Sequence, residues 1–475
     1  MKNKMVLKLF NTETGNKEPV IPINQDQALR FYTCGPTLYD YAHLGNFRTY
    51  VFEDLVRRTL EVFGISVKQV MNLTDVDDKT IRGALQRNMT LEAYTQQYKK
   101  AFFDDLDALS IKRAAIYPAA THYIPAMLTM IETLLKKGLA YRSRDGSIYY
   151  SIRHFPSYGR LSHLSLDALQ TGASNRVIVD EYGKEYASDF VLWKSYDKER
   201  DGMIFWDSPF GKGRPGWHIE CSAMARQTLG ETIDLHAGGI DNIFPHHENE
   251  IAQSEGCDNK HPFVRYWIHC HHLIVDGKKM SKTLGNFYTL RDLLDRGFSG
   301  MEVRYLLLSV HYRSQLNFTL SSLQGARHAI QRIHDFIKRL LTVKGEEKAH
   351  LSDFIQKSSY EFFHALSDDL NISAALGILF DFIRKTNQNM DQGAVSKQDS
   401  KEIFAFLHDV NAILGVMPLD LKTTSVPVDI QDAFEKRIQA RRDKNWAEAD
   451  RLRDRIYAKG YVIEDNPLGS YVKKK

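Results

Sequence analysis

The chain has 475 residues, of which 43% are hydrophobic and 26% charged, and its formal net charge is +4 at pH 7. This length exceeds a single compact core and predicts about three or four domains. No apolar run approaches the ~20 residues of a membrane span, and Met1–Met5 lacks a signal-peptide core, so we expect a cytoplasmic protein without a membrane partner. The cysteines at positions 34, 221, 257 and 270 are therefore expected to be free.

A β-α-β unit is predicted near the start of the chain. Arg30–Cys34 and Ile65–Leu73 are predicted as buried strands, and a helix with apolar residues at helical spacing is predicted from about Asn46. The tetrapeptide His43-Leu44-Gly45-Asn46 lies at the start of this helix, where backbone N–H groups and the helix dipole favour anions. This position predicts a phosphate site, and an ordinary turn with a surface histidine is the alternative.

In the middle of the chain, a segment rich in turns separates two segments with clear strand and helix patterns. Between Ala119 and Ser208, turns and mixed strands predict an insertion, with Asp145-Gly146 as a turn between two strands. Beyond it, Ile233–His236 is predicted as a strand, Gly238-Gly239 as a tight turn, and Pro245 as the first residue of a helix. The insertion is therefore expected to interrupt one α/β sheet.

The second half of the chain is predicted to be mainly helical. Apolar residues at helical spacing predict a bundle over Ser322–Gly415, with Asp391–Ser400 as a polar loop inside it. Pro418–Pro427 is predicted as a linker. A last small unit is predicted from the helix Trp446–Lys459 and the strand Tyr461–Glu464.

Four potential metal ligands come from three separated segments. His246 and Glu250 are four residues apart, so they project from one face of a helix. Cys34 ends the first predicted strand, where a doubly wound sheet forms its ligand crevice, and Cys221 precedes a later strand. The set offers a candidate zinc site, but spacing alone favours ordinary packing of four core residues.

Two further histidine patterns bear on metal binding. His247-Glu248 begins like the H-E-x-x-H helix of zinc metalloproteases, but Ile251 occupies the second histidine position and excludes that class of hydrolase. The run His269-Cys270-His271-His272 is a weaker candidate for a second metal site, with packing as its alternative.

The chain resembles the cysteinyl-tRNA synthetases, a family of class I aminoacyl-tRNA synthetases, over nearly its whole length. The segments that carry the resemblance are Tyr32–Tyr39, His43–Asn46, Asn72–Lys79, Gly216–Met224, Asp234–Glu250, Lys279–Asn286 and Lys444–Asp465. The run Pro245–Glu250 is specific to this synthetase. The chain departs from the general class I motifs at Asn46, where the class has histidine, and at Thr283, where it has serine.

The resemblance implies an α/β fold with several parts. It implies a Rossmann-like doubly wound parallel-sheet catalytic domain with an inserted connective domain, followed by an α-helical bundle and a small C-terminal anticodon-binding unit. The implied boundaries are residues 1–118 and 209–275 for the two catalytic halves, 119–208 for the insertion, 276–321 for a stem-contact region with a KMSKS-type loop, 322–418 for the bundle and 419–475 for the anticodon unit.

The resemblance also implies the reaction, its cofactors and its partners. The family joins L-cysteine and ATP to cysteinyl-adenylate with release of pyrophosphate, and then transfers cysteine to the 3′ end of tRNA(Cys). One zinc ion per chain, Mg²⁺ accompanying ATP, and a monomer are implied. Zinc binds a thiolate strongly and a neutral alcohol weakly, so the metal is expected to separate cysteine from serine.

The resemblance assigns roles to individual residues. The implied zinc ligands are Cys34, Cys221, His246 and Glu250. The implied catalytic residues are His43, Asn46, Lys279 and Lys282, and Gly45 and Ser281 join them in binding ATP. The implied cysteine-binding residues are Gly35, Thr74, Trp217, His236 and Asp241. The implied anticodon-binding residues are Arg441, Trp446, Asp450 and Asp465.

Two other functions compete with tRNA charging. A related enzyme with the same catalytic core joins cysteine to an amino-sugar but lacks the terminal unit, so the presence of Trp446–Lys475 favours tRNA. A non-catalytic protein that binds tRNA or sequesters zinc is the second alternative. The presence of both nucleotide motifs argues against it.

Overall fold

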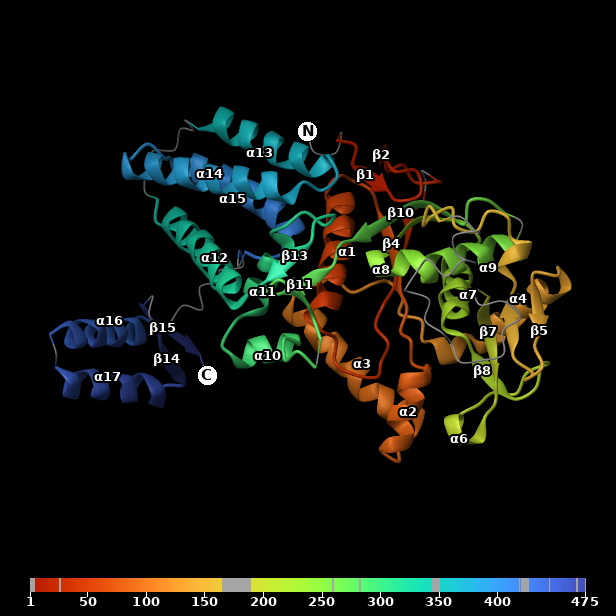
Figure 1. The fold of residues 1–475 in the computed structure, drawn as a ribbon. Helices are drawn as coiled ribbons and strands as arrows, with labels where there is room; N and C mark the ends of the chain where they lie inside the picture. Colours follow the sequence, from red (N-terminus) through yellow and green to blue (C-terminus); the bar gives the residue numbers. More distant parts are fainter. Residues whose placement is uncertain are drawn as a thin grey trace. The chain divides into compact units, whose positions relative to one another are not determined.

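A computed structural model describes residues 5–24, 27–164, 189–258, 260–281, 283–343, 351–417, 419, 427–443, 445–466 and 469–474. The chain forms two compact units, Met1–Met417 and Pro418–Lys475, and each is described by itself. Figure 1 shows the course of the chain. Among the described residues, no helix is long and apolar enough to cross a membrane.

A parallel sheet forms the centre of the first unit. Its strands, in spatial order, are β10 (Val264–Cys270), β9 (Ile233–Gly239), β3 (Leu29–Thr33) and β4 (Val67–Met71), and every neighbouring pair is parallel. Nearly all of β9 is buried, as is typical of a parallel sheet covered on both faces. The predicted α/β class and parallel sheet are confirmed, and the carboxyl ends of the strands form one edge where ligands can bind.

Helix α1 (Leu44–Val62) connects β3 to β4 and packs on the sheet (Figure 1). Its apolar residues Phe47, Val51 and Leu55 recur every four positions and are buried, which is the pattern of a helix with one face in the core. The β-α-β unit predicted from the sequence is therefore confirmed, with boundaries shifted by one or two residues.

The segment between β4 and β9 holds further helices and a second sheet. The helices are α2 (Asp78–Gln86), α3 (Leu91–Ala108), α4 (Ile124–Lys136), α6 (Lys198–Asp201) and α7 (Trp217–Leu229). The second sheet is antiparallel and contains β5 (Ala140–Arg142), β6 (Ile148–Tyr150), β7 (Phe190–Ser195) and β8 (Gly213–Pro215). Asp145-Gly146 lies between β5 and β6, as predicted, while residues 165–188 of the expected insertion lie outside the described part.

Two expectations near the carboxyl end of β9 need correction. Gly238 and Gly239 form the last residues of β9 and pair with β10, so the predicted tight turn is wrong. A Cβ atom at Gly238 would lie 2.8 Å from Cε1 of His247, so glycine is needed there for close approach and not for a turn.

The helix predicted from Pro245 begins less simply than expected. The short helix α8 (Ile240–Asn242) and a π-helical turn (Ile243–His247) precede α9 (Glu248–Asp258). Phe244 has extended backbone angles, φ −132° and ψ 130°, as is usual for a residue before proline. The α-helix therefore begins at Glu248, later than predicted, and Pro245 lies in the π-helical turn before it.

Several smaller elements surround the sheet. An N-terminal hairpin consists of β1 (Lys8–Asn11) and β2 (Asn16–Pro19). After β10 come a three-stranded sheet of β12 (Lys278–Lys279), β11 (Leu273–Val275) and β13 (Leu316–Phe318), and the helices α10 (Leu290–Asp295) and α11 (Gly300–Leu308).

A helical bundle completes the first unit, as predicted. It contains α12 (Leu320–Leu341), α13 (Ser352–Ser367), α14 (Ile372–Asp391) and α15 (Lys397–Leu414). The predicted loop Asp391–Ser400 is too long, because Ser396 and Asp399 form a capping box that starts α15 at Lys397.

The second unit is small and has its own apolar core. It contains α16 (Val428–Arg442), α17 (Trp446–Ala458) and the hairpin of β14 (Tyr461–Asn466) and β15 (Gly469–Lys474). Its core consists of Ile430, Ala433, Phe434, Leu452 and Ile456. The helix Trp446–Lys459 and the following strand are confirmed, α16 was not predicted, and most of the expected linker 418–427 lies outside the described residues.

Candidate active site

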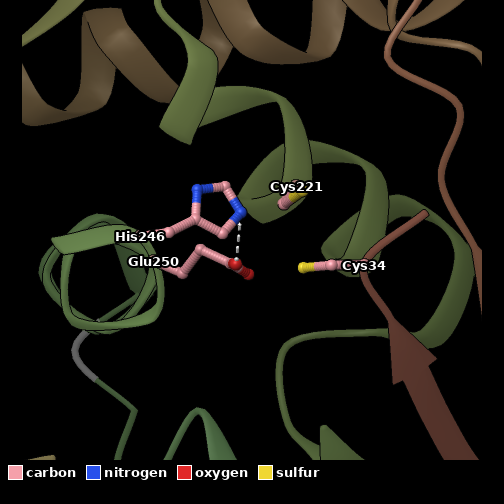
Figure 2. Close-up of side chains that lie close together, drawn as sticks. All are labelled: Cys34, Cys221, His246 and Glu250. Atoms are coloured by element: carbon pink, nitrogen blue, oxygen red, sulfur yellow. Dashed lines mark ion pairs between the residues drawn. The ribbon is translucent and has the colours of Figure 1, made fainter. Parts of the chain in front are cut away.

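Four potential metal ligands converge at the carboxyl edge of the parallel sheet. One donor atom each from Cys34, Cys221, His246 and Glu250 lies within 4.8 Å of every other. Figure 2 shows the four side chains close together, with the sulfur atom of Cys34 directed toward the Glu250 carboxylate. Cys34 follows β3, Cys221 lies in α7, and the other two come from the turn before α9 and from α9 itself. Three segments far apart in sequence therefore build one cluster.

The four side chains of the cluster lie close together in a largely buried region, so each one changes the pKa of its neighbours. The hydrogen bond between the two thiol groups lowers the pKa of Cys221 to about 6 and raises the pKa of Cys34 well above its usual range. Burial alone would lower the pKa of His246, but the negative charges of Cys221 and Glu250 raise it to about 10. Burial would likewise raise the pKa of Glu250, but His236 and His246 lower it to about 2.

The donor set fits a zinc ion. Glu250 is fully buried, and its Oε1 atom has no hydrogen bond of good geometry to any described residue, although Nε2 of His246 lies 3.1 Å away. The other oxygen, Oε2, lies 3.1 Å from Nε2 of His236. Two sulfur donors, one imidazole and one carboxylate form a ligand set typical of zinc, and a further residue that hydrogen-bonds the ligating carboxylate is common in such sites.

A second, overlapping group of potential ligands uses Cys34 and Glu250 together with His236 and His247. Both ligand groups contain Cys34 and Glu250, so the two groups belong to a single candidate metal site. Neither group of the described residues includes any member of the run 269–272, so the candidate second metal site there gains no support.

The residues expected to bind cysteine lie around this cluster. Thr74 is buried and accepts a hydrogen bond from Nδ2 of Asn72, whose Oδ1 accepts one from the backbone N–H of Gly35. The Trp217 indole is 41% exposed and stacks on His246, with ring centroids 4.3 Å apart. Solutes can therefore reach an aromatic face beside the cluster.

Asp241 lies at the rim of the same region. Its carboxylate is 3.9 Å from Nδ1 of His272 and largely exposed. It closely follows the strand end formed by Gly239. His236, in contrast, is buried beneath the cluster and contacts Glu250, so its position suits support of a ligand better than contact with solvent.

The first predicted nucleotide motif forms the start of α1. Nδ1 of His43 accepts a hydrogen bond from the backbone N–H of Asn46, and the Asn46 side chain accepts one from the backbone N–H of His43. This reciprocal pair is a capping box at the start of α1. The asparagine that departs from the class I motif therefore has a structural role at the helix terminus.

Residues that follow the second motif lie against this helix start. The backbone N–H of Leu44 donates to the carbonyl of Tyr288 over 3.0 Å, and the ring of His43 packs edge-on against Phe287. A Cβ atom at Gly45 would lie 3.4 Å from the methyl group of Met280. Residues from both predicted motifs therefore border one region.

The loop that carries Lys279 is organised by Asn286. Its Oδ1 accepts from the backbone N–H of Ser281, and its Nδ2 donates to the carbonyl of Lys279. The Lys279 side chain is exposed, and the hydroxyl that Thr283 retains lies 2.7 Å from Oγ of Ser281. Lys282 lies outside the described residues.

The expected anticodon residues lie in the second unit. Arg441 is near the end of α16, and Trp446 and Asp450 are exposed on α17. Asp450 forms an ion pair with Arg453 over 2.9 Å. Asp465 lies in β14, and its side chain is outside the described part of the structure.

Sequence reasoning missed four residues that support these sites. Asn72 and Asn286 fix loop backbones, and His247 and His269 form a buried pair with 2.8 Å between Nδ1 and Nε2. The asparagines lie inside segments that carry the family resemblance, so their position was a usable signal. The partner of His247 could not be identified from spacing, because His269 comes from a different element.

Three family models match successive parts of the chain. A model described as tRNA synthetases class I (C) catalytic domain matches residues 20–328, a DALR domain matches 361–422, and a cysteinyl-tRNA ligase anticodon binding domain matches 423–472. Among solved structures, Mycobacterium tuberculosis methionyl-tRNA synthetase bound by methionyl-adenylate has a TM-score of 0.62 at 12% identity, covering 82% of this chain and 92% of that one. The family model and the shared fold therefore define a class I aminoacyl-tRNA synthetase.

Curated relatives show which amino acid this class I synthetase uses. The cysteine–tRNA ligase of Protochlamydia amoebophila is 56% identical over 99% of this chain and 98% of its own length. The cysteine–tRNA ligase of Chlamydia pneumoniae is 54% identical over 98% of each chain. The chain belongs to the cysteinyl-tRNA synthetase family, and it is a ligase that joins cysteine to tRNA. The anticodon-domain match also favours tRNA over an amino-sugar as the acceptor.

Proposed function

We propose that this ligase selects cysteine at a zinc ion held by Cys34, Cys221, His246 and Glu250. The convergence of these four donors at the carboxyl edge of the sheet is the observation that carries the proposal. Zinc bound there would hold a thiolate far more strongly than a neutral hydroxyl, and so would separate cysteine from serine.

The surrounding residues orient the amino acid. Gly35 and Thr74 are connected through Asn72, which gives the pocket a fixed polar edge. Trp217 forms an apolar wall beside His246, and the exposed carboxylate of Asp241 can attract the substrate ammonium group.

We propose that ATP binds between the two nucleotide motifs. The substrate carboxylate attacks the α-phosphorus of ATP, and pyrophosphate leaves. Negative charge on the phosphate oxygens requires positioned cations and N–H donors. The start of α1 at His43 and Asn46 supplies donors, and Lys279 and Lys282 supply positive charge while Ser281 shapes their loop. Mg²⁺ is expected to accompany ATP.

tRNA(Cys) is the proposed acceptor of the cysteinyl group. Arg441, Trp446, Asp450 and Asp465 are the proposed anticodon contacts in the second unit. An exposed aromatic ring next to cations suits stacking on unpaired bases and contact with phosphate. We further propose that the chain acts as a monomer in the cytoplasm.

The experiment that tests the metal proposal compares the wild type with Cys221→Ser. We expect about one zinc per chain in the wild type by metal analysis, and a strong loss in the variant, because a serine hydroxyl is a poor zinc ligand. Cysteine-dependent exchange of pyrophosphate into ATP should fall with the zinc content. Cys257→Ser is the matched control, since this buried cysteine belongs to neither ligand group among the described residues.

Two results would contradict the proposal. Full cysteine-dependent exchange in a zinc-free wild type would remove the metal from substrate selection. Equal zinc content in Cys221→Ser and Cys257→Ser would remove Cys221 from the ligand set.

A further inference from the structure

A line of hydrogen bonds leads from Cys34 to the N-terminal hairpin. Sγ of Cys34 lies 3.4 Å from Nε2 of His247. Nδ1 of His247 lies 2.8 Å from Nε2 of His269, and Nδ1 of His269 lies 2.7 Å from Oγ1 of Thr12. Both rings are buried, at 0% and 4% exposure, so bulk water does not supply alternative partners.

Thr12 is held in place independently of this line. Its backbone N–H donates to the carbonyl of Trp267 over 2.7 Å, and its own carbonyl lies 3.0 Å from Nε2 of His163. The preceding residue, Asn11, accepts from the N–H of Trp267. The backbone at Thr12 is therefore fixed against β10, and its hydroxyl meets a buried ring nitrogen.

The charge on Cys34 decides the direction of the hydrogen bonds. A cysteine that binds a metal is a thiolate and can only accept, so Nε2 of His247 must carry a proton. In a neutral imidazole the other nitrogen is then an acceptor, so His269 must donate from Nε2 and accept at Nδ1. The Thr12 hydroxyl is the donor placed at that last nitrogen.

We propose that Thr12 is a positioning residue for the metal centre, because its hydroxyl fixes the tautomers of His269 and His247 so that His247 donates a hydrogen bond to the Cys34 thiolate. This inference rests on the proposed zinc site. It assigns a role in metal binding to the β1–β2 hairpin, which carries none of the predicted site residues.

The rest of the site is consistent with this role. Gly238 leaves the space that His247 occupies, since a Cβ atom there would lie 2.8 Å from Cε1 of the ring. His247 also packs on Trp267, with ring centroids 5.0 Å apart. The ring is therefore held by packing on its faces, and Thr12 determines which of its nitrogens carries the proton.

The test compares Thr12→Val with Thr12→Ser. Valine has nearly the same shape but cannot donate, whereas serine keeps the hydroxyl. Loss of a hydrogen bond that orients a metal ligand typically weakens metal binding 10–100-fold, so we expect about tenfold weaker zinc binding for Thr12→Val by competition with a chelator. Thr12→Ser should remain within about twofold of the wild type on the same scale.

Thr14→Val is the matched control on the same hairpin. Its hydroxyl donates to Glu18 at the surface and takes no part in the line to Cys34. Cobalt-substituted protein gives a readout that a merely structural change would not move, namely the sulfur-to-cobalt charge-transfer band. We expect this band to shift in Thr12→Val and to stay unchanged in Thr12→Ser and Thr14→Val.

A measurement on the wild type keeps the inference testable if Thr12→Val does not fold. In zinc-loaded protein with ¹⁵N-labelled histidine, both His247 and His269 should carry their proton on Nε2. A proton on Nδ1 of either ring, or unchanged zinc affinity and cobalt spectrum in folded Thr12→Val, would overturn the role of Thr12. Absence of zinc from the wild type would instead refute the proposed metal site itself.

Discussion

At the scale of single residues, Gly45 of the first nucleotide motif has no space for a side chain. A Cβ atom there would lie 2.9 Å from Cε1 and 3.0 Å from Nδ1 of His43. Gly45→Ala is therefore expected to displace the ring that caps α1. Because the same ring is proposed to bind ATP, a displacement that weakens its contact by about 1 kcal/mol should raise the KM for ATP in pyrophosphate exchange roughly fivefold.

Gly377→Ala is the control for this prediction. Gly377 lies in α14, and no neighbouring atom among the described residues would come within 4 Å of an added Cβ atom, so alanine should leave the KM for ATP unchanged. Alanine should also raise the stability of that helix slightly, because glycine is the poorer helix former by about 1 kcal/mol. An equal KM in both variants would show that the contact between Gly45 and His43 does not matter.

The four proposed metal ligands illustrate how far sequence reasoning reaches at this scale. The spacing of His246 and Glu250 placed them on one helix face, but only the resemblance joined them to Cys34 and Cys221. Thr12 and His269 lie in different elements and follow no local pattern, so their approach depends on the tertiary fold. Residues that support a ligand from another element carry no signal in a single sequence.

At the scale of secondary structure, α1 is held by a buried ion network. Asp54 accepts from Arg58 over 2.6 Å and from Arg304 of α11 over 2.5 Å. Burial would raise the pKa of Asp54, but the two guanidinium groups lower it below its usual range. Removing one partner of a buried ion pair costs about 3–5 kcal/mol, so Asp54→Asn should lower the free energy of unfolding by that amount at pH 7.

The pH dependence of unfolding tests the same network. A carboxyl with a lowered folded pKa contributes stability above its unfolded pKa of about 4, and loses it as the pH falls through the folded value. The difference between wild type and Asp54→Asn, measured by denaturant unfolding, should therefore be full at pH 7 and shrink below about pH 4. Asp104→Asn is the control and should leave the free energy of unfolding nearly unchanged, because it breaks only an exposed pair with Lys100.

The elements themselves were largely predictable, and the errors have physical causes. Apolar residues at helical spacing indicated the helices of the bundle, since each buries one face. The pair Gly238-Gly239 was wrongly predicted as a turn, because glycine at a strand end can also make room for a ring from another element. The start of α15 was placed late because its polar capping residues resemble a loop.

At the scale of the whole molecule, the matches to a class I catalytic domain and to an anticodon binding domain lie in different units of the chain. Trp446 is 59% exposed on α17, and stacking of one base on an aromatic ring is worth about 1–3 kcal/mol. Trp446→Ala should therefore raise the KM for tRNA(Cys) in charging assays by about tenfold or more. Pyrophosphate exchange without tRNA serves as the internal control and should not change.

The parallel α/β core and the helical bundle were foreseeable at this scale, whereas the interface between them was not. Arg304 is completely buried and donates to the carbonyls of Leu109 and Leu414, which belong to segments far apart in sequence. A buried arginine must have hydrogen-bond acceptors, but the sequence around Arg304 does not identify which carbonyl groups these are. Long-range polar contacts of this kind have to be found in the fold.

The contacts at the end of α15 limit which helical bundles could replace the one in this chain. The last carbonyls of α15, at Ala412 and Leu414, accept hydrogen bonds from Arg58 of α1 and Arg304 of α11, so the end of the bundle is joined to both of these helices. A graft that replaced the bundle without offering two carbonyl oxygens at the same places would leave each guanidinium group short of one acceptor, although both keep their contacts with Asp54. Such chimeras should be less stable even when every proposed active-site residue is kept.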